Sequence, residues 1–175
     1  MFLKESEATV LFPGGFGTFD EGFESLTLVQ SGKAKPRPIV VIDTPGDSFW
    51  RSTLKLFGMN MEGNGLISPG DMALIRHFQD AGEAVGEISG FYSNYHSSRF
   101  FKDQYLVRLR RPVPDAALRR LNVDFRDILA RGSFERLADV REDDVRDRGL
   151  ERIVFRFDRS NYSRLRQLID RFNSL

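Results

Sequence analysis

One stretch of the sequence combines residue types that bind phosphate with acidic side chains that could act in catalysis. Residues 12–21 read FPGGFGTFDE. Glycines let backbone N–H groups approach an anion closely, and a helix that begins beside them adds partial positive charge at the same place. Glu21 falls away from the apolar face of that helix, where its carboxylate can face a ligand. The predicted phosphate ligands are Gly14, Gly15, Gly17 and the hydroxyl-bearing Thr18.

The two acidic residues of this stretch have a second interpretation. Asp20 and Glu21 fall in the first turn of the predicted helix, where carboxylates stabilise the helix dipole without any ligand. An acidic residue in that position would also repel a phosphate, so a catalytic role requires its side chain to point elsewhere. The spacing alone leaves both interpretations open.

The elements around the glycine-rich turn predict a βαβ unit. Residues 9–12 form an apolar run typical of a buried strand, and an amphipathic helix follows until Gly32 supplies a C-cap. Residues 38–42 are continuously apolar, as in a parallel strand covered on both faces. A right-handed crossover then places residues 13–17 and 43–47 at one edge of the sheet, where they should line the same crevice.

The rest of the first half extends this α/β pattern. Residues 74–78 predict a third strand, and a short helix is expected over 81–88. Asp43 either contacts a ribose hydroxyl or forms a turn. Trp50 is interpreted as a core residue rather than a base-stacking platform, and His77, which has no partner nearby in the sequence, as structural.

The motif resembles that of a known enzyme family. Residues 13–21 match the PGGxGTxxE signature of the LOG (Lonely Guy) family of Rossmann-like phosphoribohydrolases, whose members have often been mislabelled lysine decarboxylases. The similarity covers roughly the first half of the chain. It implies cleavage of the N-glycosidic bond of nucleoside 5′-monophosphates to free base and ribose 5-phosphate. It also implies homodimers, phosphate contacts from the Gly14–Thr18 turn, and Glu21 as the catalytic carboxylate.

Physical chemistry agrees with those implied roles. Breaking an N-glycosidic bond builds positive charge on the sugar, which a carboxylate beside the anomeric carbon stabilises while it orients or deprotonates a water. A bound 5′-phosphate would fix the ribose against Glu21. No general acid for the departing base is identified, and neither a cofactor nor a metal is expected.

The sequence departs from the family pattern at its amino-terminal end. The family carries an arginine, in an Arg-Lys pair upstream of the glycine turn, at a position that falls before Met1. The first half of the family's nucleotide-binding fold is also absent, and residues 1–3 look like part of a helix. The sequence is therefore interpreted as an amino-terminally shortened family member, in which a thin sheet exposes apolar surface and favours self-association.

Composition limits the other possibilities. The chain has 175 residues and no cysteine, which excludes disulfides, thiolate nucleophiles and cysteine metal sites. Neither a signal peptide nor a run of apolar residues long enough for a membrane span is present, so a cytoplasmic protein without a membrane partner is expected.

The charge distribution divides the chain into two predicted domains. Residues 1–98 hold 7 basic and 12 acidic residues, whereas residues 99–175 hold 19 and 13. We expect residues 1–90 to form the carboxyl half of a Rossmann-like domain and residues 91–175 a basic domain. The basic charges are interleaved with acidic ones, as in residues 141–148, so a solvated surface is favoured over nucleic-acid binding.

The second domain is predicted to be a small α+β appendage. Residues 90–99 are interpreted as an interdomain hinge packed by its aromatic rings. Strands are expected at 106–109, half exposed, and at 152–157, and a helix at 114–128. Ser160 or Asn161 should cap a last helix, which buries Tyr162, Leu165, Leu168, Ile169 and Phe172.

Three functions stay open at this point. The favoured one is a nucleotide-binding protein related to phosphoribohydrolases. The second is a regulatory module that binds nucleotides without turnover. The third, less favoured, is a nucleic-acid-binding protein that uses the arginine-rich second half.

Overall fold

The computed structural model describes residues 5–137, 147 and 149–175. It divides into two compact units, one of Met1–Gly90 with Asn161–Arg166 and the other of Phe91–Ser160 with Gln167–Leu175. The expected helical start at residues 1–3 and nearly all of the charged run 141–148 lie outside the described residues. The division into domains at residue 90 stays a prediction. Within the described residues, no helix is both long enough and apolar enough to cross a bilayer.

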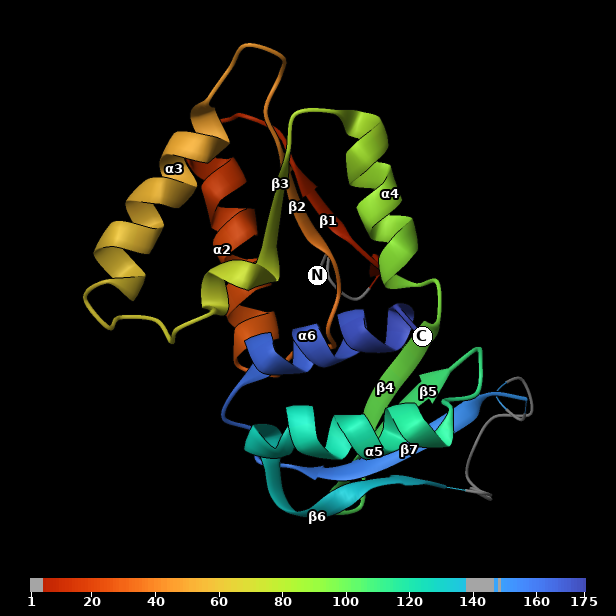
Figure 1. The fold of residues 1–175 in the computed structure, drawn as a ribbon. Coiled ribbons are helices and arrows are strands. Elements are labelled where there is room, and N and C mark those ends of the chain that lie inside the picture. Colours follow the sequence, from red (N-terminus) through yellow and green to blue (C-terminus); the bar gives the residue numbers. More distant parts are fainter. Residues whose placement is uncertain (1–4, 138–146, 148) are drawn as a thin grey trace. The chain divides into compact units, whose positions relative to one another are not determined.

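The first unit is built on a parallel three-stranded sheet (Figure 1). Its order is β1 (Thr9–Leu11), β2 (Ile39–Ile42) and β3 (Ile75–Phe78), and all pairs are parallel. Every residue of β2 is buried, because the strand pairs on both edges and is covered on both faces. The α/β fold class and the buried parallel strand are thus confirmed.

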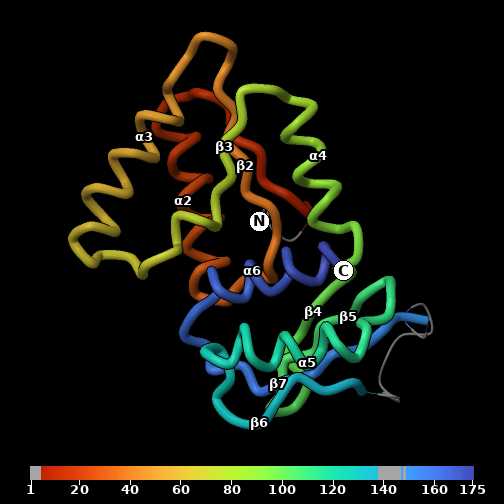
Figure 2. Tube along the Cα trace, in the orientation of Figure 1, coloured from red at the N-terminus to blue at the C-terminus, as the bar shows by residue number. Residues whose placement is uncertain are grey.

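Helices cover both faces of this sheet, and their order along the chain can be followed in Figure 2. The face of Ile39 and Val41 packs against α2 (Phe16–Gln30) and α3 (Phe49–Phe57), with Trp50 buried among them as predicted. The opposite face, that of Val40 and Ile42, packs against Ala84 of α4 (Ala81–Phe91). A π-helix (Gly58–Glu62) continues α3, and a 3-10 turn (Asp71–Leu74) precedes β3.

The first strand is more exposed than the sequence predicted. Residues 9–12 were expected to be buried, yet Val10 is 40% and Phe12 55% exposed. The reason is that β1 is an edge strand paired only with β2, and Ala84 of α4 packs on β2 rather than on β1. The apolar surface expected of a thin sheet is therefore present. Self-association through it stays a prediction.

The carboxyl end of α2 is set by a glycine in the left-handed conformation. Ser31 is the C-cap, and Gly32 follows with φ +70°, as the predicted helix stop requires. The Gly32 N–H donates to the Val29 carbonyl at 3.1 Å. A Cβ added to Gly32 would lie 2.0 Å from the Tyr162 ring, so both the backbone angle and the packing require glycine here.

In the second unit the sheet is antiparallel and has four strands in the order β4-β5-β7-β6. The strands are β4 (Tyr95–Phe101), β5 (Gln104–Leu109), β6 (Leu129–Arg136) and β7 (Glu151–Phe157). The helices are α5 (Asp115–Asp124), followed by a 3-10 turn (Arg126–Ile128), and the part of α6 (Tyr162–Asn173) from Gln167 onward, because its residues up to Arg166 belong to the first unit. The predicted α+β appendage is confirmed, but β4 and β6 were missed.

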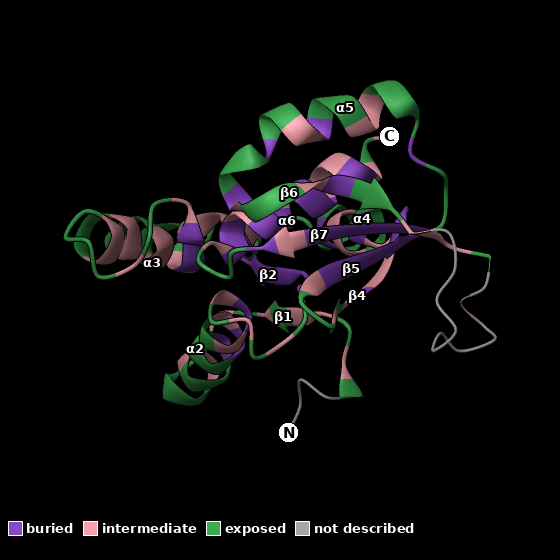
Figure 3. Cartoon of the chain, turned by 90° about the horizontal axis from the view of Figure 1, so that it is seen from below, coloured by how far each residue is buried: buried purple, intermediate pink, exposed green. Residues whose placement is uncertain are grey.

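The expectations for β5 and for residues 90–99 need correction. Residues 106–109 were predicted to be half exposed, yet β5 is almost wholly buried because it is an interior strand between β4 and β7 (Figure 3). Residues 95–99 form part of β4 rather than a hinge. The aromatic packing itself is present, since the ring of Tyr95 lies 5.2 Å from that of Phe91.

Helices α5 and α6 agree better with the sequence predictions. Phe125 and Ile128 are buried as expected, although α5 already ends at Asp124. Asn161 caps α6, because its Oδ1 accepts from the Arg164 N–H at 2.8 Å. The five apolar residues expected in α6 are all buried, namely Tyr162, Leu165, Leu168, Ile169 and Phe172.

Replacing Gly32 by alanine tests the end of α2. Gly32→Ala should lower the free energy of unfolding by at least about 1–2 kcal/mol, because the new Cβ is strained at positive φ and meets the Tyr162 ring. Gly58→Ala is the control, since Gly58 has a helical φ of −56° and no atom near its Cβ position. If urea unfolding shows the same loss of unfolding free energy for Gly32→Ala and Gly58→Ala, this explanation is contradicted.

Candidate functional site

The amino-terminal end of α2 is left without a capping side chain. Gly15 is the N-cap, with an extended backbone, and its carbonyl accepts from the N–H groups of Thr18 at 3.1 Å and Phe19 at 3.3 Å. The N–H groups of Phe16 and Gly17 donate to none of the described residues. Two backbone donors and the positive end of the helix dipole therefore remain available to an anion.

The position of the acidic residues differs from the sequence prediction. The helix begins at Phe16, so no carboxylate lies in its first turn, and Asp20 and Glu21 belong to the second turn. The sequence pattern instead predicts that these two carboxylates lie in the first turn of the helix. The earlier start removes the repulsion that a first-turn carboxylate would exert on a bound phosphate.

The glycines of the turn have two different surroundings. A Cβ on Gly14 would lie 2.2 Å from Oγ1 of Thr18, so glycine is needed there for the Thr18 side chain to pack against the turn. A Cβ on Gly15 or Gly17 would meet no atom within 4 Å. Packing within the chain does not explain glycine at these two positions, whereas an approaching ligand would.

Glu21 lies on the helix face that also carries the predicted phosphate ligands. It follows Gly17 by four residues and Thr18 by three, so the three positions share one side of α2. The rise from Gly17 to Glu21 is about 6 Å along the axis, comparable with the width of a ribose. Glu21 is exposed and forms no hydrogen bond or ion pair with the described part of the chain. No described residue therefore competes with a ligand for its carboxylate.

In contrast, the amino-terminal end of α3 is satisfied by the chain's own carboxylates. Asp43 accepts from the N–H groups of Trp50 at 2.7 Å and Arg51 at 3.1 Å. Asp47 accepts from those of Ser48 at 2.6 Å and Phe49 at 3.2 Å. Of these two helix ends, only that of α2 keeps free donors.

Asp43 is therefore a structural residue, and it has a partner that sequence reasoning missed. The His77 ring donates through Nε2 to Oδ2 of the buried Asp43 at 2.9 Å. Burial raises the pKa of the Asp43 carboxyl, but the N–H groups of Trp50 and Arg51 and the His77 ring lower it by more, so the pKa lies below its ordinary 3.8. The available signal was parallel pairing, which aligns Val41 with His77 and brings the ends of β2 and β3 together.

The carboxyl ends of the strands gather at one edge of the sheet, as predicted for a βαβ unit. The ring of Phe19 in α2 lies 5.7 Å from that of Phe49 and 5.5 Å from that of Trp50, at the start of α3. Gln79, after β3, donates to the Asp47 carbonyl at 3.4 Å. These contacts hold the loops after β2 and β3 near α2. A crevice shared by residues 13–17 and 43–47 stays a prediction.

Comparison with protein families matches residues 1–88 to the family described as "Possible lysine decarboxylase". The match spans half of the chain and includes the glycine turn, α2 and the whole parallel sheet. The chain belongs to the LOG family. No curated protein matched the sequence. The LOG family match ends before β4, so it does not extend to the antiparallel sheet of the second unit.

An Asp43→Asn variant tests the structural role of this carboxylate. The depressed pKa means that ionised Asp43 stabilises the fold above pH 3.8 and loses this effect as the pH falls through the folded-state value. The variant should lose about 1–3 kcal/mol of unfolding free energy near neutral pH, because buried N–H groups lose a charged acceptor. The difference in unfolding free energy between the variant and the wild type should shrink below pH 3.8.

Asp20→Asn is the control for this experiment, because Asp20 is exposed and lies in the second turn of α2. Chemical denaturation at several pH values measures both variants. If the difference in unfolding free energy between the wild type and Asp43→Asn does not change with pH, the structural role of the ionised Asp43 carboxylate is contradicted.

Proposed function

We propose that this LOG family member binds nucleoside 5′-monophosphates at the start of α2 and hydrolyses their N-glycosidic bond. The observation that carries the proposal is the uncapped helix end, where the N–H groups of Phe16 and Gly17 donate to none of the described residues, within the segment that matches the family. The Thr18 hydroxyl lies against the same turn and would add a donor to the phosphate.

The proposed chemistry uses Glu21 beside the sugar. With the phosphate held at the turn, the ribose extends along α2 toward the Glu21 carboxylate. The bond from the anomeric carbon to the base nitrogen breaks, and its electron pair leaves with the base, which takes up a proton from solvent. The carboxylate stabilises the positive charge on the sugar and orients the water whose oxygen bonds to the anomeric carbon. That water releases one proton to solvent, which balances the proton taken up by the base and gives ribose 5-phosphate.

The homodimer implied by the resemblance is part of the proposal. Several apolar side chains around the site are exposed, including Phe16 at 94% and Phe23 at 39%. A second copy that covers this surface would also exclude water from the site, which strengthens electrostatic stabilisation of the sugar cation.

Glu21→Gln tests the catalytic role. Release of free base from AMP, GMP, CMP and cytokinin monophosphates should fall by at least about 100-fold, because the amide cannot stabilise the sugar cation by charge. Nucleotide affinity should change much less, since the phosphate contacts remain. Glu24→Gln, an exposed glutamate on the same helix, is the matched control. Unchanged turnover in Glu21→Gln would contradict the role; binding without turnover in the wild type would indicate a regulatory nucleotide-binding module instead.

Gly17→Ala separates binding from folding. The new Cβ has open space, and alanine favours a helix by up to about 1 kcal/mol, so stability should stay equal or rise. AMP affinity, measured by calorimetry, should fall by about tenfold or more, because the methyl group takes space that the phosphate would occupy. Full AMP affinity in this variant would place the phosphate elsewhere.

A further inference from the structure

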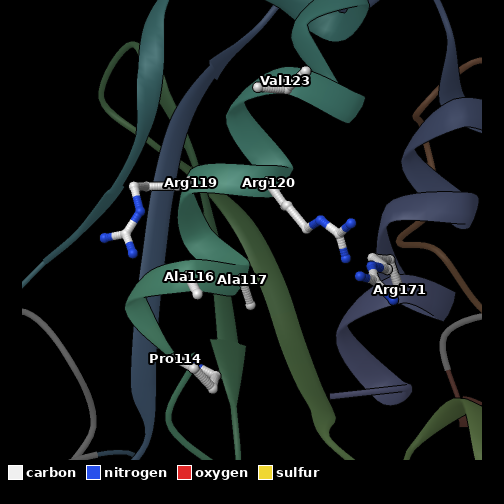
Figure 4. A pocket seen from close by; sticks show the side chains of 7 residues that line it. All are labelled: Pro114, Ala116, Ala117, Arg119, Arg120, Val123 and Arg171. Carbon is white, nitrogen blue, oxygen red and sulfur yellow. The ribbon is translucent and has the colours of Figure 1, made fainter.

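The second unit carries an open groove between α5 and α6, with a volume of about 590 Å³ (Figure 4). None of the described residues that line it carries a carboxylate. Its lining combines cationic with small or apolar side chains, among them Ala116, Ala117, Arg119, Arg120, Val123 and Arg171. Nothing in the nucleotide site proposed above uses this groove, and it lies outside the region that matches the LOG family.

The arginines of the groove have no anionic partner among the residues that the structure describes. Arg119 and Arg120 form no hydrogen bond or ion pair with the described residues, and for Arg171 the only side-chain partner found among them is the neutral Ser174 hydroxyl, at 3.4 Å. Arg120 extends from α5 toward Arg171 on α6 (Figure 4). Two like charges that converge in this way repel each other, and an anionic group placed between them would reverse the sign of the interaction.

Other arginines of the same unit are paired with carboxylates. Arg136 binds Asp115 at 2.7 Å and Glu151 at 2.9 Å, and Arg156 binds Asp103 at 2.8 Å. The lack of carboxylates is thus a property of the groove and not of the whole unit. Its guanidinium forks are suited to carboxylate or phosphate groups of a ligand.

The apolar side chains of the lining favour a peptide over a nucleic acid as the ligand that carries these anionic groups. Ala116 and Ala117 leave room for a backbone or side chain to approach closely, and Val123 is 75% exposed. A nucleic-acid backbone would gain nothing from this apolar surface, and the lining residues within the described ranges include no aromatic ring on which a base could stack. A peptide that carries both apolar side chains and carboxylates would use both parts of the lining.

We infer that the groove between α5 and α6 binds an acidic amphipathic helix of a partner protein. The apolar face of that helix lies on Ala116, Ala117 and Val123. Its flanking carboxylates pair with Arg119, Arg120 and Arg171. The groove is thus a docking surface separate from the nucleotide site, and the inference does not depend on catalysis at Glu21.

The test uses the full chain and three fluorescent probes of matched length or charge. The first is a synthetic helix of about four turns, with leucines on one face and glutamates elsewhere. The second is a polyglutamate peptide of equal charge, and the third a short DNA duplex. Fluorescence anisotropy should show tightest binding to the leucine–glutamate helix, with affinity that falls as salt is added.

Two variants locate the binding. Arg120→Glu combined with Arg171→Glu should weaken binding of the leucine–glutamate helix by at least about tenfold, because each reversal replaces attraction by repulsion. Val123→Asp should weaken it to a similar degree through the apolar contact. Arg126→Glu, an exposed arginine outside the groove lining, is the control and should leave affinity unchanged. Thermal unfolding verifies that each variant is folded.

Three outcomes would overturn the inference. They are equal or tighter binding of polyglutamate or duplex DNA, loss of affinity in the Arg126→Glu control as large as in the groove variants, and no measurable binding of the leucine–glutamate helix to the folded wild type.

Discussion

The backbone N–H groups at the start of α2 have no acceptor within the described chain, and the proposed nucleotide site depends on them. Gly15 begins the helix without a side chain that could cap it, and the open space at Gly15 and Gly17 lets a ligand reach the donors. A serine or aspartate at the N-cap would stabilise the helix and occupy one of these donors, the Gly17 N–H. The helix therefore lacks the stability that a capping side chain would add, and a bound anion could stabilise this helix end in its place.

The loops that follow β1 and β2 explain why the N–H groups at the start of α2 have no acceptor in the described chain, whereas those of α3 do. Both helices follow strands whose carboxyl ends lie at one edge of the sheet. The loop after β2 carries Asp43 and Asp47, which occupy the N–H groups of α3, while the turn after β1 has no carboxylate and ends in Gly14 and Gly15. His77 on the neighbouring strand holds the Asp43 carboxylate in place. The two loops therefore have different roles, one structural and one open to a ligand.

Local sequence patterns predicted the features that depend on local interactions. The apolar run of β2, the helical spacing in α6 and the glycine stop at Gly32 all specify their structures within a few residues. The glycines and Glu21 were found because a short motif contains them.

Features set by distant partners were missed. Burial of β5 follows from strands on both sides of it, and the Asp43–His77 pair requires the register of two strands. In β6, Gly132 has a positive φ, the register shifts, and Phe134 alone is buried, so no alternation signals a strand.

A crystal structure of the chain with AMP bound tests the nucleotide site most directly. The expected result is density for the phosphate within hydrogen-bonding distance of the Phe16 and Gly17 N–H groups and the Thr18 hydroxyl, with the ribose next to Glu21. Phosphate density at the start of α3 or elsewhere, or an unoccupied turn at an AMP concentration that saturates the protein in solution, would contradict the proposed site.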